Sequence, residues 1–194
     1  AFNLLDVGAG SHSATKTKSV FAGCNYYGID ITREYENDEQ DFKAMSGFYE
    51  MDLTALNFET IPDNFFDVII MSHIIEHLHN GDKVIEGLMP KLKKDGYIYI
   101  EYPGERSTRL PHMKRTLNFY DDPTHVRIYA VKEVENILTK SGCSILKSGT
   151  RRYWPYIVLL PFTLLTETLK YGFVPGGVFW DLLGFAEYVF AKKN

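Results

Sequence analysis

Short apolar runs alternate along the chain with longer amphipathic stretches. The apolar runs are rich in Val, Ile, Tyr and Phe, and most of them end at Gly, Asp or Pro, which is typical of β-strands. Several have no polar face, which indicates parallel strands buried on both sides. The pattern predicts strands at residues 2–7, 26–31, 48–51, 66–71, 97–102, 144–147 and 188–191.

Between the strands the spacing of apolar residues becomes helical. Residues 82–93 carry Val84, Ile85, Leu88 and Leu92 on one face, and residues 131–140 show the same pattern. Residues 13–21 are rich in Ser, Thr and Lys and predict a short or irregular helix, and the charged stretch 33–46 predicts a helix only weakly. Alternating strands and helices predict a single α/β domain over residues 1–194, with a doubly wound, mostly parallel seven-stranded sheet.

Ligands of such sheets bind at the carboxyl ends of the strands, so the residues found there are the first candidates for a site. The first strand runs into Gly8-Ala9-Gly10, a turn in which glycine allows a ligand to approach the backbone and free N–H groups can hold it. Asp30 ends the second strand, at a spacing that suits the ribose hydroxyls of an adenosine, and Asp52 follows the third. Each feature also occurs in ordinary turns and strand ends.

Four segments in order resemble the motifs of class I S-adenosylmethionine-dependent methyltransferases, closest to the branch that acts on small molecules such as sugars and lipids of the cell envelope. Residues 5–10 (LDVGAG) resemble the first motif and residues 27–31 (YGIDI) the second. Residues 65–78 resemble the fourth-strand motif, and residues 92–98 the turn before strand five. The resemblance covers residues 1–148 and implies that the last strand is antiparallel.

The resemblance also implies a site for S-adenosylmethionine. Asp6, Gly8, Ala9 and Gly10 would surround its methionine part, Asp30 and Ile31 its ribose, Asp52 and Leu53 its adenine, and Ser72 and His73 its sulfonium region. One position departs from the family: His12 stands where a third glycine is common, and its Cβ is expected to narrow the approach to the cofactor. The same departure weakens a nicotinamide dinucleotide interpretation, which needs G-x-G-x-x-G.

A different chemistry is suggested by His73-Ile74-Ile75-Glu76-His77, which matches the H-x-x-E-H pattern of zinc hydrolases. On a helix, His73 and His77 would share a face and Glu76 would act as a base. The motif directly follows a buried strand, which argues against that arrangement. In the methyltransferase interpretation no residue is assigned to a metal, and His77 either lines the pocket or steadies the turn.

Methyl transfer to a hydroxyl benefits from a general base, and a histidine suits that role at neutral pH. His125 is the strongest candidate, because the insert at residues 103–129 follows strand five and should lie over the pocket; related methyltransferases carry a similar D-P-x-H-x-R stretch. His77 and Tyr102 are further candidates for contact with the acceptor. The same insert carries cationic residues that either grip an anionic acceptor or form a solvated face: Arg106, Arg109, His112, Lys114 and Arg115.

The insert at residues 151–184 is apolar and aromatic, and its longest uncharged run is too short to span a bilayer. It is a lid over a hydrophobic acceptor, a segment lying on a membrane surface, or a core or homodimer face. The net charge of −4 argues against a nucleic-acid partner, and the two separated cysteines fit the reducing cytoplasm, with membrane association as an alternative.

Taken together, the sequence predicts an enzyme that transfers a methyl group from S-adenosylmethionine to an oxygen or nitrogen atom of a small acceptor, with both inserts on the substrate side. A zinc hydrolase using His73, Glu76 and His77 is one alternative. A non-catalytic domain that binds S-adenosylmethionine is the other.

Overall fold

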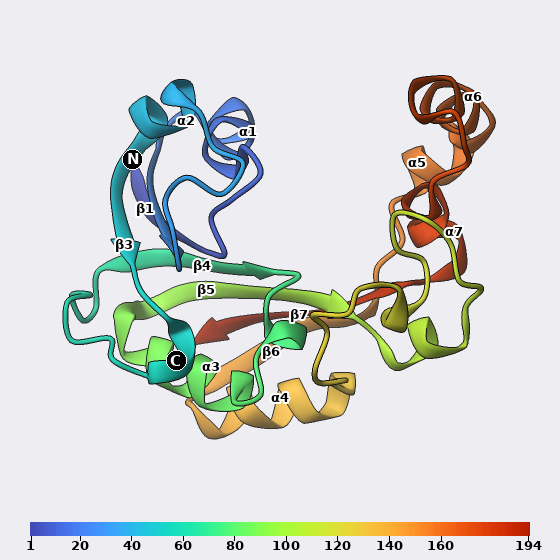
Figure 1. The fold of residues 1–194 in the computed structure, drawn as a ribbon. Helices are drawn as coiled ribbons and strands as arrows, with labels where there is room; N and C mark the ends of the chain where they lie inside the picture. Colours follow the sequence, from blue (N-terminus) through green and yellow to red (C-terminus); the bar gives the residue numbers. More distant parts are fainter.

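The computed structural model describes residues 1–194, and its framework is one seven-stranded sheet with the order β3-β2-β1-β4-β5-β7-β6 (Figure 1). All strands are parallel except β7, which pairs antiparallel with both β5 and β6. The predicted doubly wound sheet with an antiparallel last strand is therefore confirmed. The strands are β1 (Phe2–Val7), β2 (Cys24–Asp30), β3 (Met45–Glu50), β4 (Phe66–Ser72), β5 (Leu92–Pro103), β6 (Cys143–Thr150) and β7 (Ala186–Lys193).

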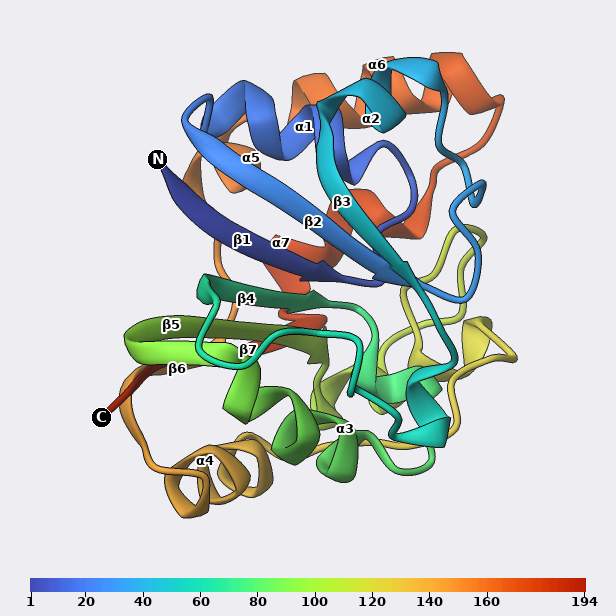
Figure 2. The ribbon, with the colours of Figure 1, turned by 90° about the vertical axis from the view of Figure 1, so that its left-hand side faces the viewer.

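Helices cover the two faces of the sheet unequally. Figures 1 and 2 place α3 (Gly81–Leu88) and α4 (Val131–Lys140) on one side, and α1 (Ser13–Val20) and α2 (Glu39–Ala44) on the other. The main apolar core lies between the sheet and the α3–α4 layer, and both helices contribute buried side chains to it. Only a small second core lies beneath α1. The α1–α2 side is thus thinly packed.

The amphipathic pattern correctly predicted both helices that face the core, but it predicted one of them to be too long. Val84, Ile85 and Leu88 of α3 are buried, as are Val134 and Leu138 of α4. However, α3 ends at Leu88, because Pro90 lacks an N–H and stands in a single 3-10 turn, after which β5 begins at Leu92. The prediction of a helix over residues 82–93 is wrong beyond residue 88.

The charged stretch 33–46 contains only one short helix. Asp38 begins α2 by accepting hydrogen bonds from the N–H groups of Gln40 (2.7 Å) and Asp41 (3.1 Å), while the Asp41 carboxylate accepts from Asp38 N (3.0 Å). This reciprocal cap defines the first turn of the helix. The residues before Asp38 form no helix, and the chain passes directly from Ala44 into β3.

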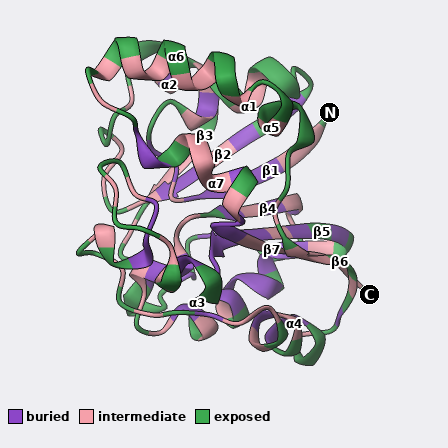
Figure 3. Ribbon diagram, turned by 90° about the vertical axis from the view of Figure 1, so that its right-hand side faces the viewer, coloured by how far each residue is buried: buried purple, intermediate pink, exposed green.

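The insert at residues 151–184 forms three short helices on the α1–α2 side of the sheet: α5 (Trp154–Val158), α6 (Leu160–Tyr171) and α7 (Trp180–Leu183) (Figures 1 and 3). No residue of α5 or α6 is buried. The insert is held at α7, where Trp180 stacks on Phe185 at 4.5 Å between ring centroids and donates from Nε1 to Thr116 O at 2.6 Å. None of the helices combines the length and the apolar character that crossing a membrane would require.

Candidate functional site

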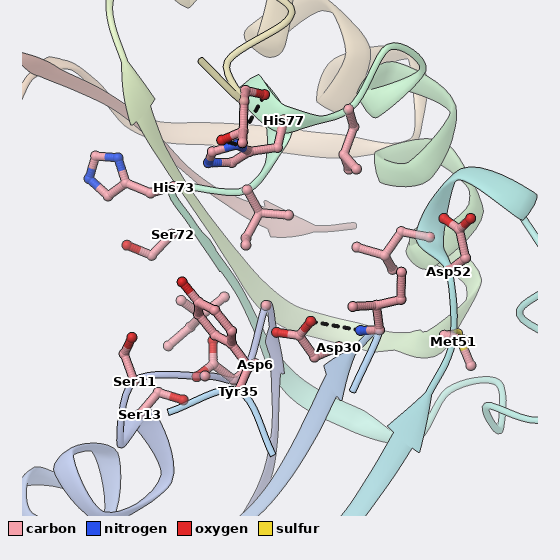
Figure 4. A pocket seen from close by; sticks show the side chains of 18 of the residues that line it. Asp6, Ser11, Ser13, Asp30, Tyr35, Met51, Asp52, Ser72, His73 and His77 are labelled. Carbon is pink, nitrogen blue, oxygen red and sulfur yellow. Dashed lines mark hydrogen bonds between the residues drawn. The ribbon is translucent and has the colours of Figure 1, made fainter. Parts of the chain in front are cut away.

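An open cavity of about 880 Å³ lies at the carboxyl ends of β1, β2 and β4 and beside the segment that follows β3 (Figure 4). Its volume is within the range of small-molecule and cofactor sites. Ten residues singled out from the sequence line it together: Asp6, Gly8, Gly10, Asp30, Ile31, Asp52, Leu53, Ser72, His73 and His77. Side chains from four separate strand ends thus meet in one hollow, as the switch-point rule predicts.

Gly8 and Gly10 are both required by close packing in the first turn. Gly8 has a φ of +85°, and a Cβ on it would come within 1.9 Å of Ile74 Cδ1. A Cβ on Gly10 would meet the ring of Tyr35 at 2.4 Å. Ala9 lies between them but is fully buried and does not line the cavity, so its predicted place in the cofactor site is not supported.

The N–H groups of this turn are not free, contrary to the expectation from the sequence. Gly8 and Ala9 donate to Ile29 O, and Gly10 donates to Gly8 O. Ser11 and His12 donate to the carbonyls of Tyr35 and Glu36, so the 31–37 segment closes over the turn. Backbone carbonyls therefore accept from the N–H groups that the sequence assigned to a ligand. Hydrogen bonds to a ligand at this turn would have to come from side chains.

His12 does not narrow the cavity. Its backbone is left-handed (φ 58°), a conformation that glycine would adopt more easily, and its side chain lies outside the cavity lining. The imidazole Nδ1 instead lies 2.6 Å from Asp41 Oδ2, and the same buried carboxylate accepts from Thr15 Oγ1 at 2.7 Å. His12 thus fastens α1 to α2, and the predicted obstruction is wrong.

Three carboxylates face the cavity in different states. Asp6 is almost fully buried, and this burial raises its pKa to about 6 although Tyr26 donates a hydrogen bond to it at 2.6 Å. Asp30 is half-buried, and desolvation raises its pKa. Asp52 is exposed, and hydrogen bonds from the side chain and N–H of Thr54 lower its pKa. Asp30 and Asp52 accept these local hydrogen bonds through Oδ1 alone, which leaves Oδ2 for a ligand.

The cavity also contains side chains that the sequence did not indicate. Tyr35 comes from the segment after β2 and lies beside Gly10, and Lys16 reaches from α1, donating from Nζ to Ser11 O at 2.6 Å. Thr124 is the only cavity residue from the 103–129 insert. None of these belongs to a recognisable local pattern, because each enters the cavity through a tertiary contact.

His73 is enclosed by charged and aromatic groups. Its Nε2 lies 3.2 Å from Glu101 Oε1 and its Nδ1 lies 3.3 Å from Glu76 Oε1. Burial alone would lower the pKa of His73, but the two carboxylates outweigh it and raise that pKa to about 9. Trp180 of the 151–184 insert packs on the ring at 5.0 Å between centroids.

The zinc-hydrolase arrangement that the sequence offered as an alternative is not formed. His73 has a φ of 55° and lies before the single 3-10 turn Ile75–His77, so His73 and His77 do not share a helix face. Two other sets of residues are close enough to share an ion: Glu76, His77 and His125, and His12, Asp38 and Asp41. The proposed His73–Glu76–His77 triad is therefore contradicted by the backbone.

Two of the predicted catalytic residues lie behind the cavity wall. The His125 side chain is only 5% exposed, packs against the rings of His77 and Phe119, and does not line the cavity. Tyr102 is fully buried against Tyr129 in the main core. Direct contact of either residue with an acceptor is thus not supported, whereas His77 does face the cavity.

The cationic residues of the 103–129 insert do not reach the cavity either. Lys114 and Arg115 lie over the rings of Phe173 and Tyr171, at 5.2 Å and 4.1 Å from their centroids. His112 pairs with Asp121 at 2.7 Å, while Arg106 and Arg109 are exposed. These cations hold the two inserts together or face solvent, which agrees with the solvated-face alternative and gives no support to a grip on an anionic acceptor.

Comparisons with known proteins agree with this architecture. A family model described as a methyltransferase domain matches residues 2–148. Over 134 residues the chain is 26% identical to the uncharacterized methyltransferase YcgJ of Bacillus subtilis; the match covers 67% of this chain and 52% of YcgJ, so the chain spans about half the length of this curated relative.

Solved structures with low sequence identity share the fold over the whole chain. An S-adenosylmethionine dependent methyltransferase from Mesorhizobium loti matches with a TM-score of 0.70 at 14% identity, covering 100% of this chain and 91% of that one. The 1,6-didemethyltoxoflavin-N1-methyltransferase of Burkholderia thailandensis, solved with 1,6-didemethyltoxoflavin and S-adenosylhomocysteine, matches with a TM-score of 0.62 at 13% identity, covering 100% and 71%. The chain therefore belongs to the methyltransferase domain family and has the fold of the class I S-adenosylmethionine-dependent methyltransferases.

Proposed function

We propose that this protein transfers a methyl group from S-adenosylmethionine to an oxygen or nitrogen atom of a small acceptor. The observation that carries the proposal is the single cavity in which the glycine turn, Asp30 and Asp52 face Ser72 and His77. Such a hollow has acidic hydrogen-bond acceptors for an adenosine at one end and a histidine at the other. Family membership supports the reaction type.

The residues present fit the cofactor. The missing Cβ atoms of Gly8 and Gly10 keep the turn close to Ile74 and Tyr35 and leave room in front of it. Asp30 and Asp52 each keep one carboxylate oxygen free, Asp30 for the ribose hydroxyls and Asp52 for the adenine amine. The Asp6 carboxylate stands where the ammonium of the methionine part would be neutralised, and the cofactor itself supplies an electrophilic methyl group.

His77 is the residue that we place at the acceptor. Thr124 donates its hydroxyl hydrogen to Asp122 Oδ1 at 2.5 Å, so Thr124 Oγ1 can only accept from His77 Nδ1, 2.9 Å away. This fixes the proton of a neutral imidazole on Nδ1 and leaves a lone pair on Nε2. Positioning of the acceptor supplies most of the acceleration in such a displacement, and a basic nitrogen at its hydroxyl adds about 10²–10⁴-fold.

We further propose that the acceptor is amphipathic, such as a sugar or lipid-linked metabolite of the cell envelope, and that the 151–184 insert brings the protein to a lipid surface. Val158, Phe162, Leu165 and Leu169 recur at helical spacing and are 58–76% exposed. Glu167 is the only acidic residue of α5 and α6. An apolar helix face with so little negative charge suits the interface of an anionic membrane.

Sedimentation with anionic vesicles tests the surface proposal. We expect the protein to co-sediment, and Phe162→Ser combined with Leu169→Ser to reduce the bound fraction several-fold without changing cofactor affinity. Binding that survives this double substitution would reject the lipid contact. A concentration-dependent dimer that the double substitution dissociates would assign the face to a second copy of the chain.

Calorimetric titration with S-adenosylhomocysteine tests the cofactor site. We expect micromolar binding that falls at least tenfold in Asp30→Ala, because the variant loses a charged hydrogen-bond acceptor. Asp95→Ala, an exposed carboxylate paired with Lys192 at the other end of the sheet, is the matched control and should bind normally. Absence of binding in the unaltered protein would refute the proposal.

A non-catalytic domain would also bind S-adenosylhomocysteine, but it would not transfer a methyl group. Radiolabelled S-adenosylmethionine incubated with a panel of hydroxyl and amine acceptors separates the two, because label transfer to any acceptor requires an enzyme. Binding without transfer to any member of a broad panel would favour the regulatory alternative.

A further inference from the structure

Glu76, His77 and His125 offer three ligand atoms that all lie within 4.8 Å of one another at the edge of the cavity. Glu76 and His77 belong to the 3-10 turn after β4, and His125 comes from the 103–129 insert. The insert is tied to that turn because the N–H groups of Val126 and Arg127 both donate to Glu76 O, at 2.8 Å and 3.1 Å. The cluster is therefore built by the backbone and is not a chance meeting of surface side chains.

The Glu76 carboxylate is buried without satisfying its hydrogen-bonding capacity. It is 1% exposed, and its polar contacts are confined to Oε1. Oε1 lies 3.3 Å from His73 Nδ1 and 4.0 Å from His77 Nε2, but Oε2 has no partner at all. Folded proteins rarely leave a buried carboxylate oxygen unpaired, because its desolvation is costly.

Each histidine has its Nδ1 anchored, which leaves Nε2 as the nitrogen that can bind an ion when the ring is neutral. His125 Nδ1 lies 2.6 Å from Phe119 O, and because a carbonyl only accepts, this nitrogen carries the hydrogen. His77 Nδ1 carries its hydrogen toward Thr124 for the same reason. The Nε2 atoms of the neutral rings are then the basic ones. Histidines that bind metals are oriented in this way, with the second nitrogen held by a backbone carbonyl or a hydrogen-bonded side chain.

We propose that Glu76, His77 and His125 form a binding site for one divalent transition-metal ion, zinc by preference, at the acceptor end of the cavity. Two imidazoles and one carboxylate are the donor set of catalytic zinc sites, which keep the fourth position open. Ligand atoms at about 2.1 Å from a tetrahedral ion are about 3.4 Å apart, so the side chains need to close by roughly an ångström. The sequence did not indicate this set: its zinc alternative used His73 with Glu76 and His77, and His125 lies far from them in the chain.

This inference rests on the proposed function and changes how the acceptor is activated. Of the three residues only His77 lines the cavity, so an ion held there would be reached by an acceptor from the His77 side. An acceptor hydroxyl bound there has a lowered pKa, and the ion replaces His77 as the activating group. Transfer forms one O–C bond and breaks one S–C bond; the hydroxyl proton passes to solvent, and the sulfonium becomes a neutral thioether. Acceptors with a hydroxyl group are thereby favoured.

Titration of the chelator-treated protein with Co²⁺, followed by its visible absorption and by displacement with Zn²⁺, tests the site directly. We expect one equivalent to bind, and His125→Ala and Glu76→Gln to weaken the affinity at least about a hundredfold. Thr124→Val should weaken it about tenfold while leaving the ligands in place, because it only removes the group that orients His77.

Two histidine substitutions serve as controls. His79→Ala removes an exposed imidazole two residues from His77, and His12→Asn removes the histidine of a second cluster with Asp38 and Asp41. Both should leave the bound cobalt unchanged. Cobalt binding that is unaffected by His125→Ala and Glu76→Gln would overturn the site, as would no binding by protein that still binds S-adenosylhomocysteine. Metal binding without S-adenosylhomocysteine binding would leave this site standing and refute the proposed function.

Discussion

The Asp6 carboxylate makes the stability of this protein depend on pH in an unusual direction. Burial raises its pKa from 3.8 to about 6 in the folded state, and hydrogen bonds from Tyr26 and Ser13 only partly oppose that effect. Between pH 4 and pH 6 the folded protein holds a proton at Asp6 that the unfolded chain has lost. The free energy of unfolding contributed by this group therefore decreases as pH rises through that window, and the charged carboxylate costs about 3 kcal/mol above it.

Replacement of Asp6 by Asn removes the titrating group but keeps an oxygen that can accept from the Tyr26 hydroxyl. At pH 7.5 we expect Asp6→Asn to be more stable than the unaltered protein by up to about 3 kcal/mol, with the difference vanishing near pH 4. Urea unfolding at pH 4.5, 6.0 and 7.5 measures the difference, and other carboxylates cancel because both proteins carry them. The same variant should bind S-adenosylhomocysteine more weakly, since it lacks the charge that meets the ammonium group.

Glu59→Gln, a change at an exposed carboxylate, is the control and should alter neither the stability nor its pH dependence. Equal slopes of stability against pH for Asp6→Asn and the unaltered protein would refute the reasoning. So would a loss of stability in Asp6→Asn at pH 7.5. A stabilised variant with weakened binding would identify Asp6 as a position where stability is sacrificed for function.

Two further comparisons use pairs of residues that differ in one physical factor. Gly8 and Gly142 both have a φ of +85°, but a Cβ would strike Ile74 only at Gly8. In urea unfolding we expect Gly142→Ala to lower the free energy of unfolding by about 1 kcal/mol, and Gly8→Ala to lower it by at least about 2 kcal/mol more. Similar costs would show that Ile74 yields freely. Trp180 anchors the 151–184 insert, whereas Trp154 is 67% exposed. We expect Trp180→Ala to lower the free energy of unfolding by about 2–4 kcal/mol and to speed proteolysis within the insert. Trp154→Ala should change that free energy by no more than about 0.5 kcal/mol. Equal protease sensitivity of the two variants would argue against the anchor.

The sheet could be predicted from the sequence because its signal is local. Runs such as residues 68–71 are apolar on both faces, a pattern typical of a buried parallel strand. Asp30 and Asp52 could be predicted for a related reason, since a polar residue that ends a parallel strand must lie at the edge where ligands bind. This rule predicts at which edge of the sheet a residue lies, and it needs no knowledge of side-chain contacts.

Contacts between distant segments could not be predicted in this way. His125 was expected over the cavity, but the hydrogen bonds from Val126 and Arg127 to Glu76 O draw the insert down beside the 3-10 turn. Tyr35 enters the site because its carbonyl accepts from Ser11 N, a pairing that no spacing rule describes. In both cases a backbone hydrogen bond between residues far apart in the chain decides where a side chain lies.

The pairing of Thr150 with Glu187 at the end of the β6–β7 ladder has a consequence for how this fold can diversify. Both ends of the 151–184 insert leave the sheet side by side, so the segment between them can lengthen, shorten or be exchanged at little entropic cost to the sheet. Such an exchange is constrained where the insert touches the rest of the molecule, as where Trp180 packs on His73 at the cavity wall and donates to Thr116 O. The molecule is in this sense modular: the insert can be exchanged at one hairpin while the sheet and the cavity at its edge stay intact.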